Sequence, residues 1–346
     1  MTPTRRSRLG RRRSQPTLAL AGAGYIAVVH ALAAAAAGVR VAAVASAGGS
    51  SARHLAGELD AKRCRPEDLP SGADLLVVAT PPDHHVGLAL QGIDAGAAVL
   101  VEKPLATTLA DADRLAEATR AGTSTVRCAE NLLHSPAWRA AMERRAGHGP
   151  LEHLSVRTLQ PPPDWGHFAG PLRAGGVLFD LGPHPIALAL AVAAEAPVGV
   201  SAELSSTRDD GADDDARLEI RFGSGLVATL HVSWTSPEPT WDLQAAGDEL
   251  VLRWELLPEL RLEHNGDEVA LTSRFEAADP RLEQFGYVDQ LLDVLSASNV
   301  GQDVEQAVGV LELICAAYAS AGLGGTEVAL PFTGDRSRTP MQHWRG

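Results

Sequence analysis

The chain has 346 residues, of which 45% are hydrophobic and 21% are charged, and its formal net charge is −13. This length predicts two domains, each able to bury its own core. Six arginines lie within the first thirteen residues, and removing their charges from −13 leaves −19 for the rest, which excludes attraction to nucleic acid by charge alone. Cys64, Cys128 and Cys315 are too widely spaced for a metal motif and favour a reducing compartment, the cytoplasm.

The basic N-terminus is expected to be a flexible leader over residues 1–15. Arg11-Arg12-Arg13-Ser14, followed by an apolar run to Ala37, is similar to a twin-arginine export signal. Gly22 and Gly24 interrupt that run and divide it into a strand, a turn and a helix. We interpret it as folded structure and expect neither export nor a membrane span.

The strand predicted at 17–21 is followed by Gly22-Ala23-Gly24-Tyr25-Ile26-Ala27 and a helix to Ala37. This order matches the dinucleotide fingerprint Gly-x-Gly-x-x-Gly/Ala in its required strand–turn–helix context. The first glycine permits the tight turn, the second lets a pyrophosphate approach, and the free amides of the helix N-terminus attract phosphate. The cofactor-binding residues expected here are Gly22, Gly24, Tyr25 and Ile26.

The second strand, 39–45, decides the choice of nucleotide. An NAD site would place Asp or Glu at its end, whereas this chain has Ser46 followed by small and hydroxyl residues. Nothing there repels a 2′-phosphate, so the sequence favours NADP, with NAD as the alternative. Arg53 could assist or could be solvated, and the lack of an arginine directly after Ser46 weakens the preference.

Further buried strands are predicted at 73–80 and from Val99 to the position before Glu102, and they alternate with helices. This alternation predicts a doubly wound parallel sheet, whose ligands bind beyond the carboxyl ends of the strands. A helix at 109–121 and a strand at 125–129 complete the domain. Asn131 follows that strand and could contact the nicotinamide ribose or the substrate, or could cap the turn. Residues expected at the other strand ends are Gly22, Ser46, Thr80, Pro81, Glu102 and Lys103.

Lys103 is one of two lysines, the other being Lys62, in a chain whose 30 basic residues are otherwise arginine. A lysine ammonium changes its pKa readily when it is buried, whereas arginine keeps its proton. We therefore interpret Lys103 as catalytic. The alternative is a lysine that merely pairs with Glu102 at a strand end.

From Pro150 the pattern changes to strands, with two helices near 281–298 and 304–321 and a loose tail at 336–346. The fold class expected is α/β, with an N-terminal Rossmann sheet and a C-terminal α+β domain that has an open, mostly antiparallel sheet. The acidic run 209–215 lacks calcium-loop spacing and is interpreted as a solvated turn, so no metal is expected. The domains expected are the leader 1–15, a Rossmann domain at 16–130, a substrate and oligomerisation domain at 131–335 and the tail 336–346.

A second group of chemical residues lies in Gly175-Gly176-Val177-Leu178-Phe179-Asp180-Leu181-Gly182-Pro183-His184-Pro185. Asp180 and His184 are four residues apart, so they share a face if this segment is helical. A carboxylate beside an imidazole sets up a general acid or base. The alternative is a histidine satisfied at a helix start near a capping aspartate.

The ordered set Gly22-Ala23-Gly24, Glu102-Lys103-Pro104 and Asp180-x-Gly182-x-His184 resembles the Gfo/Idh/MocA oxidoreductase family, over roughly residues 17 to 333. The resemblance implies that Lys103, Asp180 and His184 converge over a nicotinamide, and His85 stands where the family has a histidine. It implies a sugar or cyclitol substrate and a homodimer or homotetramer formed through the C-terminal sheet. The loop 161–168 departs from the family, and its Trp165 and His167 could line the sugar pocket or pack the loop.

The hypothesis is hydride transfer between a nicotinamide and a carbinol or ketone carbon. His184 takes the hydroxyl proton, Asp180 orients His184 or holds a neighbouring hydroxyl, and Lys103 stabilises the developing alkoxide. Lys103 and His184 could exchange roles. The alternatives are a nucleotide-binding regulatory subunit without turnover and a glycosidase that uses NAD for transient oxidation.

Overall fold

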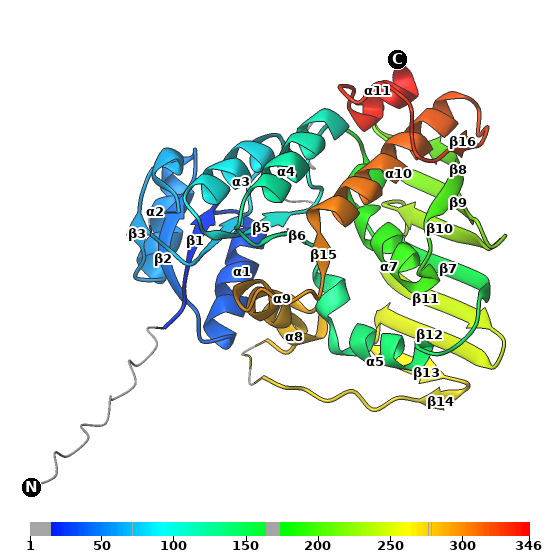
Figure 1. Ribbon diagram of the computed structural model, residues 1–346, viewed down its shortest axis with the longest axis horizontal. Helices are drawn as coiled ribbons and strands as arrows, with labels where there is room; N and C mark the ends of the chain where they lie inside the picture. Colours follow the sequence, from blue (N-terminus) through cyan, green and yellow to red (C-terminus); the bar gives the residue numbers. More distant parts are fainter. Residues whose placement is uncertain (1–14, 71, 164–173, 276, 278) are drawn as a thin grey trace, which may run out of the picture.

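A computed structural model describes residues 15–70, 72–163, 174–275, 277 and 279–346. Figure 1 shows two β-sheets side by side, with helices packed between them. Within the described residues, sheet A is parallel apart from one short strand, and sheet B is mostly antiparallel. The predicted α/β fold class, a Rossmann sheet beside an open antiparallel sheet, is confirmed.

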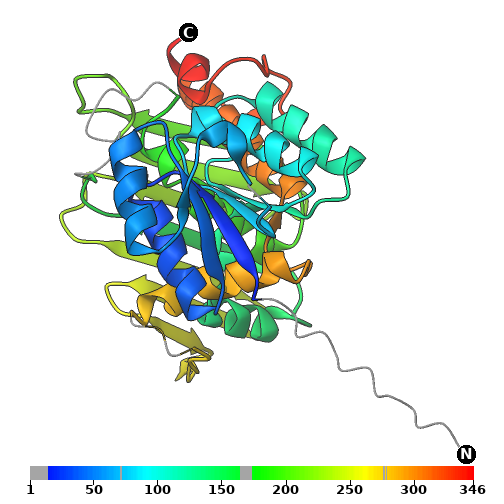
Figure 2. The same cartoon turned by 90° about the vertical axis from the view of Figure 1, so that its left-hand side faces the viewer.

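Sheet A carries the apolar strands of the N-terminal half in the order β15-β6-β5-β4-β1-β2-β3. The longer strands are largely apolar because helices cover both faces of the sheet, whereas the short edge strand β3 consists of Lys62 and Arg63. Figure 2 shows α1 and α2, in blue, on one side of the strands and α3 and α4, in cyan, on the other. The bounds are β1 (Thr17–Ala21), α1 (Tyr25–Ala36), β2 (Arg40–Ala45), α2 (Gly49–Glu58), β3 (Lys62–Arg63), β4 (Leu75–Val78), α3 (His85–Asp94), β5 (Ala98–Glu102), α4 (Leu109–Ala121), β6 (Val126–Ala129) and β15 (Gln302–Asp303).

The register of sheet A aligns the strand ends that the sequence selected. Ala21 of β1 pairs with the last residues of both β2 and β4, Ala45 and Val78. Val78 in turn pairs with Val101 of β5. The residues that follow these strands therefore lie along one edge of the sheet, where β1 separates β2 from β4 and the order reverses. Such a switch point is where doubly wound sheets bind their ligands.

Sheet B has the order β14-β13-β12-β11-β7-β10-β9-β8-β16 among the described residues. Side chains alternate between a buried face, which helices cover, and a polar face, as in β9. The central pair β7 and β10 is parallel. The bounds are β7 (Leu151–Leu159), β8 (Pro197–Ser205), β9 (Asp215–Phe222), β10 (Val227–Ser233), β11 (Thr240–Gly247), β12 (Leu250–Leu257), β13 (Arg261–His264), β14 (Asp267–Glu268) and β16 (Val328–Ala329).

The helices after residue 130 join the two sheets. The helix predicted near 281–298 is divided at Gly286, whose φ of +84° suits glycine, and both pieces pack into the core beside α1. Together with β15, these pieces attach residues beyond 280 to sheet A. The helical bounds are η1 (Pro66–Asp68), η2 (Pro82–His84), η3 (Asn131–His134), α5 (Pro136–Arg145), α6 (Val177–Asp180), α7 (Pro183–Ala193), α8 (Arg281–Gln284), α9 (Tyr287–Leu295), α10 (Val304–Gly322) and α11 (Pro340–Arg345).

The helix α10 is the longest one after residue 300. Within the described residues it alone has the length and apolar composition of a membrane span, a property that the sequence analysis did not assign to it. Most of it is buried, and it contacts α4, β8 and α11. The helix therefore packs as the core element between the two sheets.

The prediction of a loose tail at 336–346 is wrong. Arg336 forms ion pairs with Asp113 of α4, at 2.6 Å, and with Glu312 of α10, at 3.2 Å. Thr339 and Gln342 then form a reciprocal capping box that starts α11. This cap satisfies the first amides of α11 and so stabilises the helix. The spacing of Thr339 and Gln342 is a sequence signal for such a cap.

The interpretation of the acidic run 209–215 as a solvated turn is wrong for Asp213 and Asp214, which are buried. The Asp213 carboxylate accepts N–H groups from Gly176 and Leu178, both at 2.8 Å, and the hydroxyl of Tyr318. Burial raises the pKa of Asp213, although these donors oppose that shift. Asp213 thereby satisfies amides at the N-terminus of α6, which the helix itself cannot satisfy.

Replacing Gly176 by alanine tests this close approach. An added Cβ would lie 2.0 Å from the backbone oxygen of Asp213 and 2.6 Å from its nitrogen, so one of the two segments must move. We expect Gly176→Ala to lower the free energy of unfolding by ~2–3 kcal/mol, the usual cost of overpacking. Urea denaturation followed by circular dichroism measures it.

The matched control is Gly309→Ala in α10, where an added Cβ meets no atom within 4 Å. Alanine should stabilise that helix by ~0.5–1 kcal/mol. Equal unfolding midpoints for the two variants would contradict the predicted contact between Gly176 and Asp213.

Candidate active site

The turn between β1 and α1 has the shape that a dinucleotide requires. Gly22 has a φ of +120°, and a Cβ there would lie 2.1 Å from the Ala79 oxygen. A Cβ on Gly24 would meet nothing within 4 Å, so the space over this residue is open. No side chain caps the N-terminus of α1, and the first residue, Tyr25, is 66% exposed. The uncapped amides and the open space fit a pyrophosphate, with Ile26 in the same first turn.

A basic residue that was not predicted as part of the site lies beside the end of β2. β3 pairs with β2 so that Arg63 lies opposite Val44. A Cβ on Gly49, at the start of α2, would lie 2.8 Å from the Arg63 guanidinium. A cation therefore stands beside the loop that follows Ser46, where the adenosine ribose of a dinucleotide binds. No sequence signal marks the two-residue strand that places it there.

Lys103 extends from the end of β5 to α6. Its ammonium donates to the Asp180 carboxylate at 2.9 Å and to the Asp180 backbone oxygen at 2.8 Å. Burial alone would lower the pKa of Lys103, but the charge and hydrogen bond of Asp180, with Glu102 and Glu130 nearby, raise it overall. The ammonium has three N–H groups and uses two of them here.

Glu102 does not pair with the Lys103 ammonium. Its carboxylate lies 2.7 Å from Nε2 of His30, a fully buried residue of α1, and it also accepts the backbone N–H of Lys103 at 3.1 Å. Burial would raise the pKa of Glu102, but the hydrogen bond and the charges of His30 and Lys103 lower it overall. Tyr287 of α9 meets the His30 ring edge-on, with 5.9 Å between ring centroids.

The expected contact between Asp180 and His184 is replaced by a longer-range one. His184 Nδ1 lies 2.7 and 2.9 Å from the two carboxylate oxygens of Glu130, the residue that follows β6. The helix α6 ends at Asp180, and α7 begins at Pro183, which has no N–H to continue the helical hydrogen bonds. Asp180 and His184 therefore belong to different helices, and they pair with Lys103 and Glu130 respectively, residues that directly follow strands of sheet A.

His85 and Asn131 are buried near the strand ends and form hydrogen bonds with backbone oxygens there. The His85 ring is fully buried between two backbone oxygens, those of Pro104 at 2.9 Å and Thr80 at 2.8 Å, and burial lowers its pKa. Asn131 is buried too, and its amide donates to the Phe285 oxygen at 2.8 Å. These hydrogen bonds rigidify the strand ends and occupy polar groups of both side chains. Beside them, Thr80 Oγ1 is enclosed without a partner in the described chain, and Pro81 is exposed.

Trp165 and His167 lie outside the described residues. Glu130, His30 and Arg63 complete the candidate site and were not predicted. Glu130 carried a usable signal, because it directly follows a predicted strand of the parallel sheet. His30 is a single polar residue in an alanine-rich helix, a weaker signal. The described residues contain no group of three side chains arranged to hold a metal ion.

Comparison with known proteins agrees with this geometry. Residues 17–129 match the family model of the GFO/IDH/MocA oxidoreductases, an NAD-binding Rossmann fold, and residues 140–253 match the GFO/IDH/MocA C-terminal domain. The chain is 29% identical over 187 residues to 1,5-anhydro-D-fructose reductase of Ensifer adhaerens, a match that covers 51% of the chain and 55% of that protein. It is 25% identical over 232 residues to the D-xylose 1-dehydrogenase [NADP(+)] of Haloarcula marismortui, a match that covers 62% of this chain and 63% of that protein.

These matches span less than two thirds of the length of either curated relative. A solved structure extends the likeness to nearly the whole chain. GenD2 from gentamicin A biosynthesis, solved in complex with NAD, superposes with a TM-score of 0.80 at 25% identity and covers 94% of this chain and 99% of that one. The family models match both halves of the fold, including the turn that contains Gly22 and Gly24 (the glycine turn). The chain therefore belongs to the Gfo/Idh/MocA oxidoreductase family.

Proposed function

We propose that this chain is an NAD(P)-dependent oxidoreductase that transfers hydride between a nicotinamide and a carbinol or ketone carbon of a sugar or cyclitol. The observation that carries the proposal is the ion pair of Lys103 with Asp180. This pair holds the segment that contains His184 beside the end of β5. The end of β5 lies on the same edge of sheet A as the turn that contains Gly22 and Gly24. The activities of the reductase and dehydrogenase relatives support it.

The bound nucleotide would supply or accept the hydride. Lys103 holds one N–H beyond the two that Asp180 takes, and this group can donate to the substrate oxygen as negative charge develops there. Asp180 keeps the lysine in place. Glu102 and the amides of Tyr25 and Ile26 would hold the nucleotide. A regulatory subunit would need only the glycine turn, so the buried ion pairs beyond it favour an enzyme.

NADP is the cofactor that we favour. Ser46 leaves no carboxylate to repel a 2′-phosphate, and the Arg63 guanidinium lies beside Gly49 in the following loop. A guanidinium binds phosphate oxygens through a fork of N–H groups. The NADP(+) dependence of the xylose dehydrogenase relative is consistent with this preference.

We also propose that the enzyme is cytoplasmic and forms a homodimer or homotetramer through the polar face of sheet B. In the described residues no helix covers this face (Figure 1), and β7, β8, β9 and β10 form a shallow depression on it. Arg217, Glu219 and Arg157 lie there with both signs of charge, which suits contact with a second copy. Trp165 and His167 are proposed substrate contacts.

Lys103→Met tests the catalytic site. Loss of the donor should lower kcat by ~100-fold to 1,000-fold while nucleotide affinity stays within ~3-fold, because the charge acts on the transition state. Nicotinamide fluorescence measures binding, and a screen of keto-sugars and polyols measures turnover.

The control is Lys62→Met, at the only other lysine, which is exposed on β3 and should leave kcat unchanged. Normal turnover in Lys103→Met, or wild-type protein that binds neither NADPH nor NADH, would refute the proposed function.

Arg63→Gln tests the choice of nucleotide. A lost hydrogen bond to a charged group costs ~1.5–3 kcal/mol, so the Kd for NADPH should rise about tenfold or more, with the Kd for NADH unchanged. Arg53→Gln is the comparison, because Arg53 is also exposed near this loop. A loss of NADPH affinity only in the Arg53 variant would assign the 2′-phosphate to Arg53 instead.

Thr229→Arg tests the subunit contact. Thr229 is exposed in the depression on sheet B, so a large cation there should separate the copies. Light scattering coupled to size-exclusion chromatography should give a dimer or tetramer for the wild type and a smaller species for the variant. A monomeric wild type would contradict the proposed assembly.

A further inference from the structure

His184 and Glu130 form a buried pair whose geometry fixes the position of one proton. A carboxylate only accepts hydrogen bonds, and both oxygens of Glu130 lie within 2.9 Å of His184 Nδ1. Nδ1 therefore carries a hydrogen. No hydrogen-bond partner of the other ring nitrogen, Nε2, is found within the described chain, and 8% of the His184 side chain is exposed. In the neutral ring Nε2 carries a lone pair that can accept a hydrogen bond.

Lys103 is unsuited to receive that proton. Its ammonium donates to the carboxylate and to the backbone oxygen of Asp180, and the negative charge of that carboxylate favours the charged form of the lysine. Burial would lower the pKa of Lys103, but Asp180 raises it overall. The lysine therefore stays protonated at neutral pH, where it can donate a hydrogen bond but cannot accept one.

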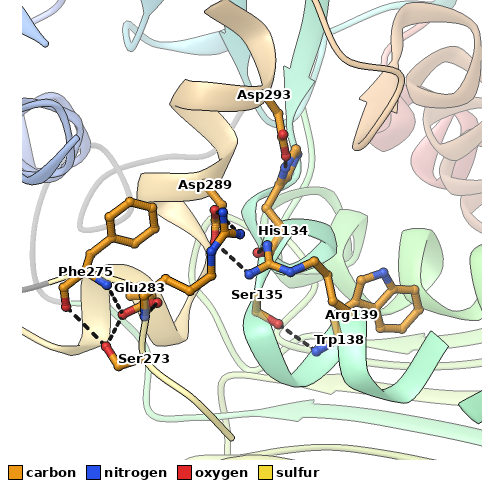
Figure 3. Close-up of polar contacts among 10 residues, drawn as sticks. His134, Ser135, Trp138, Arg139, Ser273, Phe275, Glu283, Asp289 and Asp293 are labelled. Carbon is orange, nitrogen blue, oxygen red and sulfur yellow. Dashed lines mark hydrogen bonds and ion pairs between the residues drawn. The ribbon is translucent and has the colours of Figure 1, made fainter. Parts of the chain in front are cut away.

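Contacts from α9 hold Glu130 in place. The Gln290 side-chain oxygen, in the amide orientation that satisfies both partners, accepts the backbone N–H groups of Glu130 at 3.2 Å and Asn131 at 3.1 Å. Further along the same segment, His134 bonds Asp293 at 2.7 Å, as Figure 3 shows. The carboxylate is therefore presented by a segment that is bonded to α9 at several points.

Figure 3 also shows how α9 is fixed to its surroundings. Arg139 of α5 bonds Asp289 at 2.8 Å, and the buried Glu283 of α8 accepts donors from the segment that contains Ser273 and Phe275. These contacts connect α5, α8 and α9 into one support. The backbone of Glu130 is thus held in place by tertiary contacts.

We infer that Glu130 is a positioning residue that fixes His184 in the tautomer with Nδ1–H and makes Nε2 the atom that exchanges the proton with the substrate. In oxidation the hydroxyl O–H bond breaks and an N–H bond forms at Nε2, while Glu130 keeps Nδ1–H and balances the imidazolium charge. In reduction the same proton returns from Nε2 to the oxygen. This inference rests on the proposed function for its substrate, and on the geometry alone for the tautomer.

The first test is nitrogen NMR of protein labelled with ¹⁵N-histidine, and it needs no turnover. The wild-type His184 signals should show hydrogen on Nδ1 and a bare Nε2. In Glu130→Gln the amide can donate to Nδ1, so the hydrogen should move to Nε2. The comparison is Glu102→Gln, which changes the other buried carboxylate–histidine pair and should leave the His184 signals unaltered. Hydrogen on Nε2 in the wild type would overturn the inference.

The second test is kinetic. Glu130→Gln should lower kcat ~100-fold or more, as expected when a catalytic histidine is held in the wrong tautomer, with the Kd for NADPH within ~2-fold. Glu130→Asp should restore part of kcat, and formate should partly restore kcat in Glu130→Ala. Unchanged kcat in all three variants would overturn the inference. Protein with the expected tautomer but no sugar turnover would refute the proposed function and leave the positioning role standing.

Discussion

The hydrogen-bonded ion pair between Lys103 and Asp180 connects the two halves of this molecule. One partner ends a strand of sheet A, and the other ends α6, which contacts strands of sheet B. Burying an ammonium is costly unless its N–H groups are satisfied, and Asp180 satisfies two of them with one residue. That arrangement requires α6 to end at a fixed point. Asp213 supplies the fixed point at the other end, by bonding the first amides of α6.

The buried charged side chains of the candidate site form separate pairs. Three buried carboxylates lie there, and an unpaired buried carboxylate would be unstable. Asp180 takes the lysine, whereas Glu102 and Glu130 each take a histidine, from α1 and α7 respectively. Imidazole can gain or lose a proton near neutral pH, whereas the Lys103 ammonium, whose pKa Asp180 raises against the effect of burial, keeps its charge.

Local pattern was sufficient for β1, β2, β4, β5 and β6 but not for the two-residue strands β3 and β15, because only the longer strands are largely apolar runs whose polar end residues fall on one edge. It was insufficient for the pair Asp180 and His184. A spacing of four places two residues on one face only if the helix is continuous, and here α6 ends at Asp180 before α7 begins at Pro183. The partner of His184 is Glu130, which lies 54 residues away in sequence. Only the tertiary structure brings these two residues together. Asp213 was missed for the same reason.

Under the proposed function, the polar groups that the buried pairs leave unused would let one site serve both directions of reaction. After the pairs form, Lys103 retains one N–H donor and His184 retains Nε2. A hydroxyl can accept from the lysine while it donates to a neutral Nε2. A ketone oxygen can only accept, and it finds two donors when Nε2 is protonated. Under that proposal, the protonation state of one imidazole, held in place by Glu130, would select whether the alcohol or the ketone is the better bound partner.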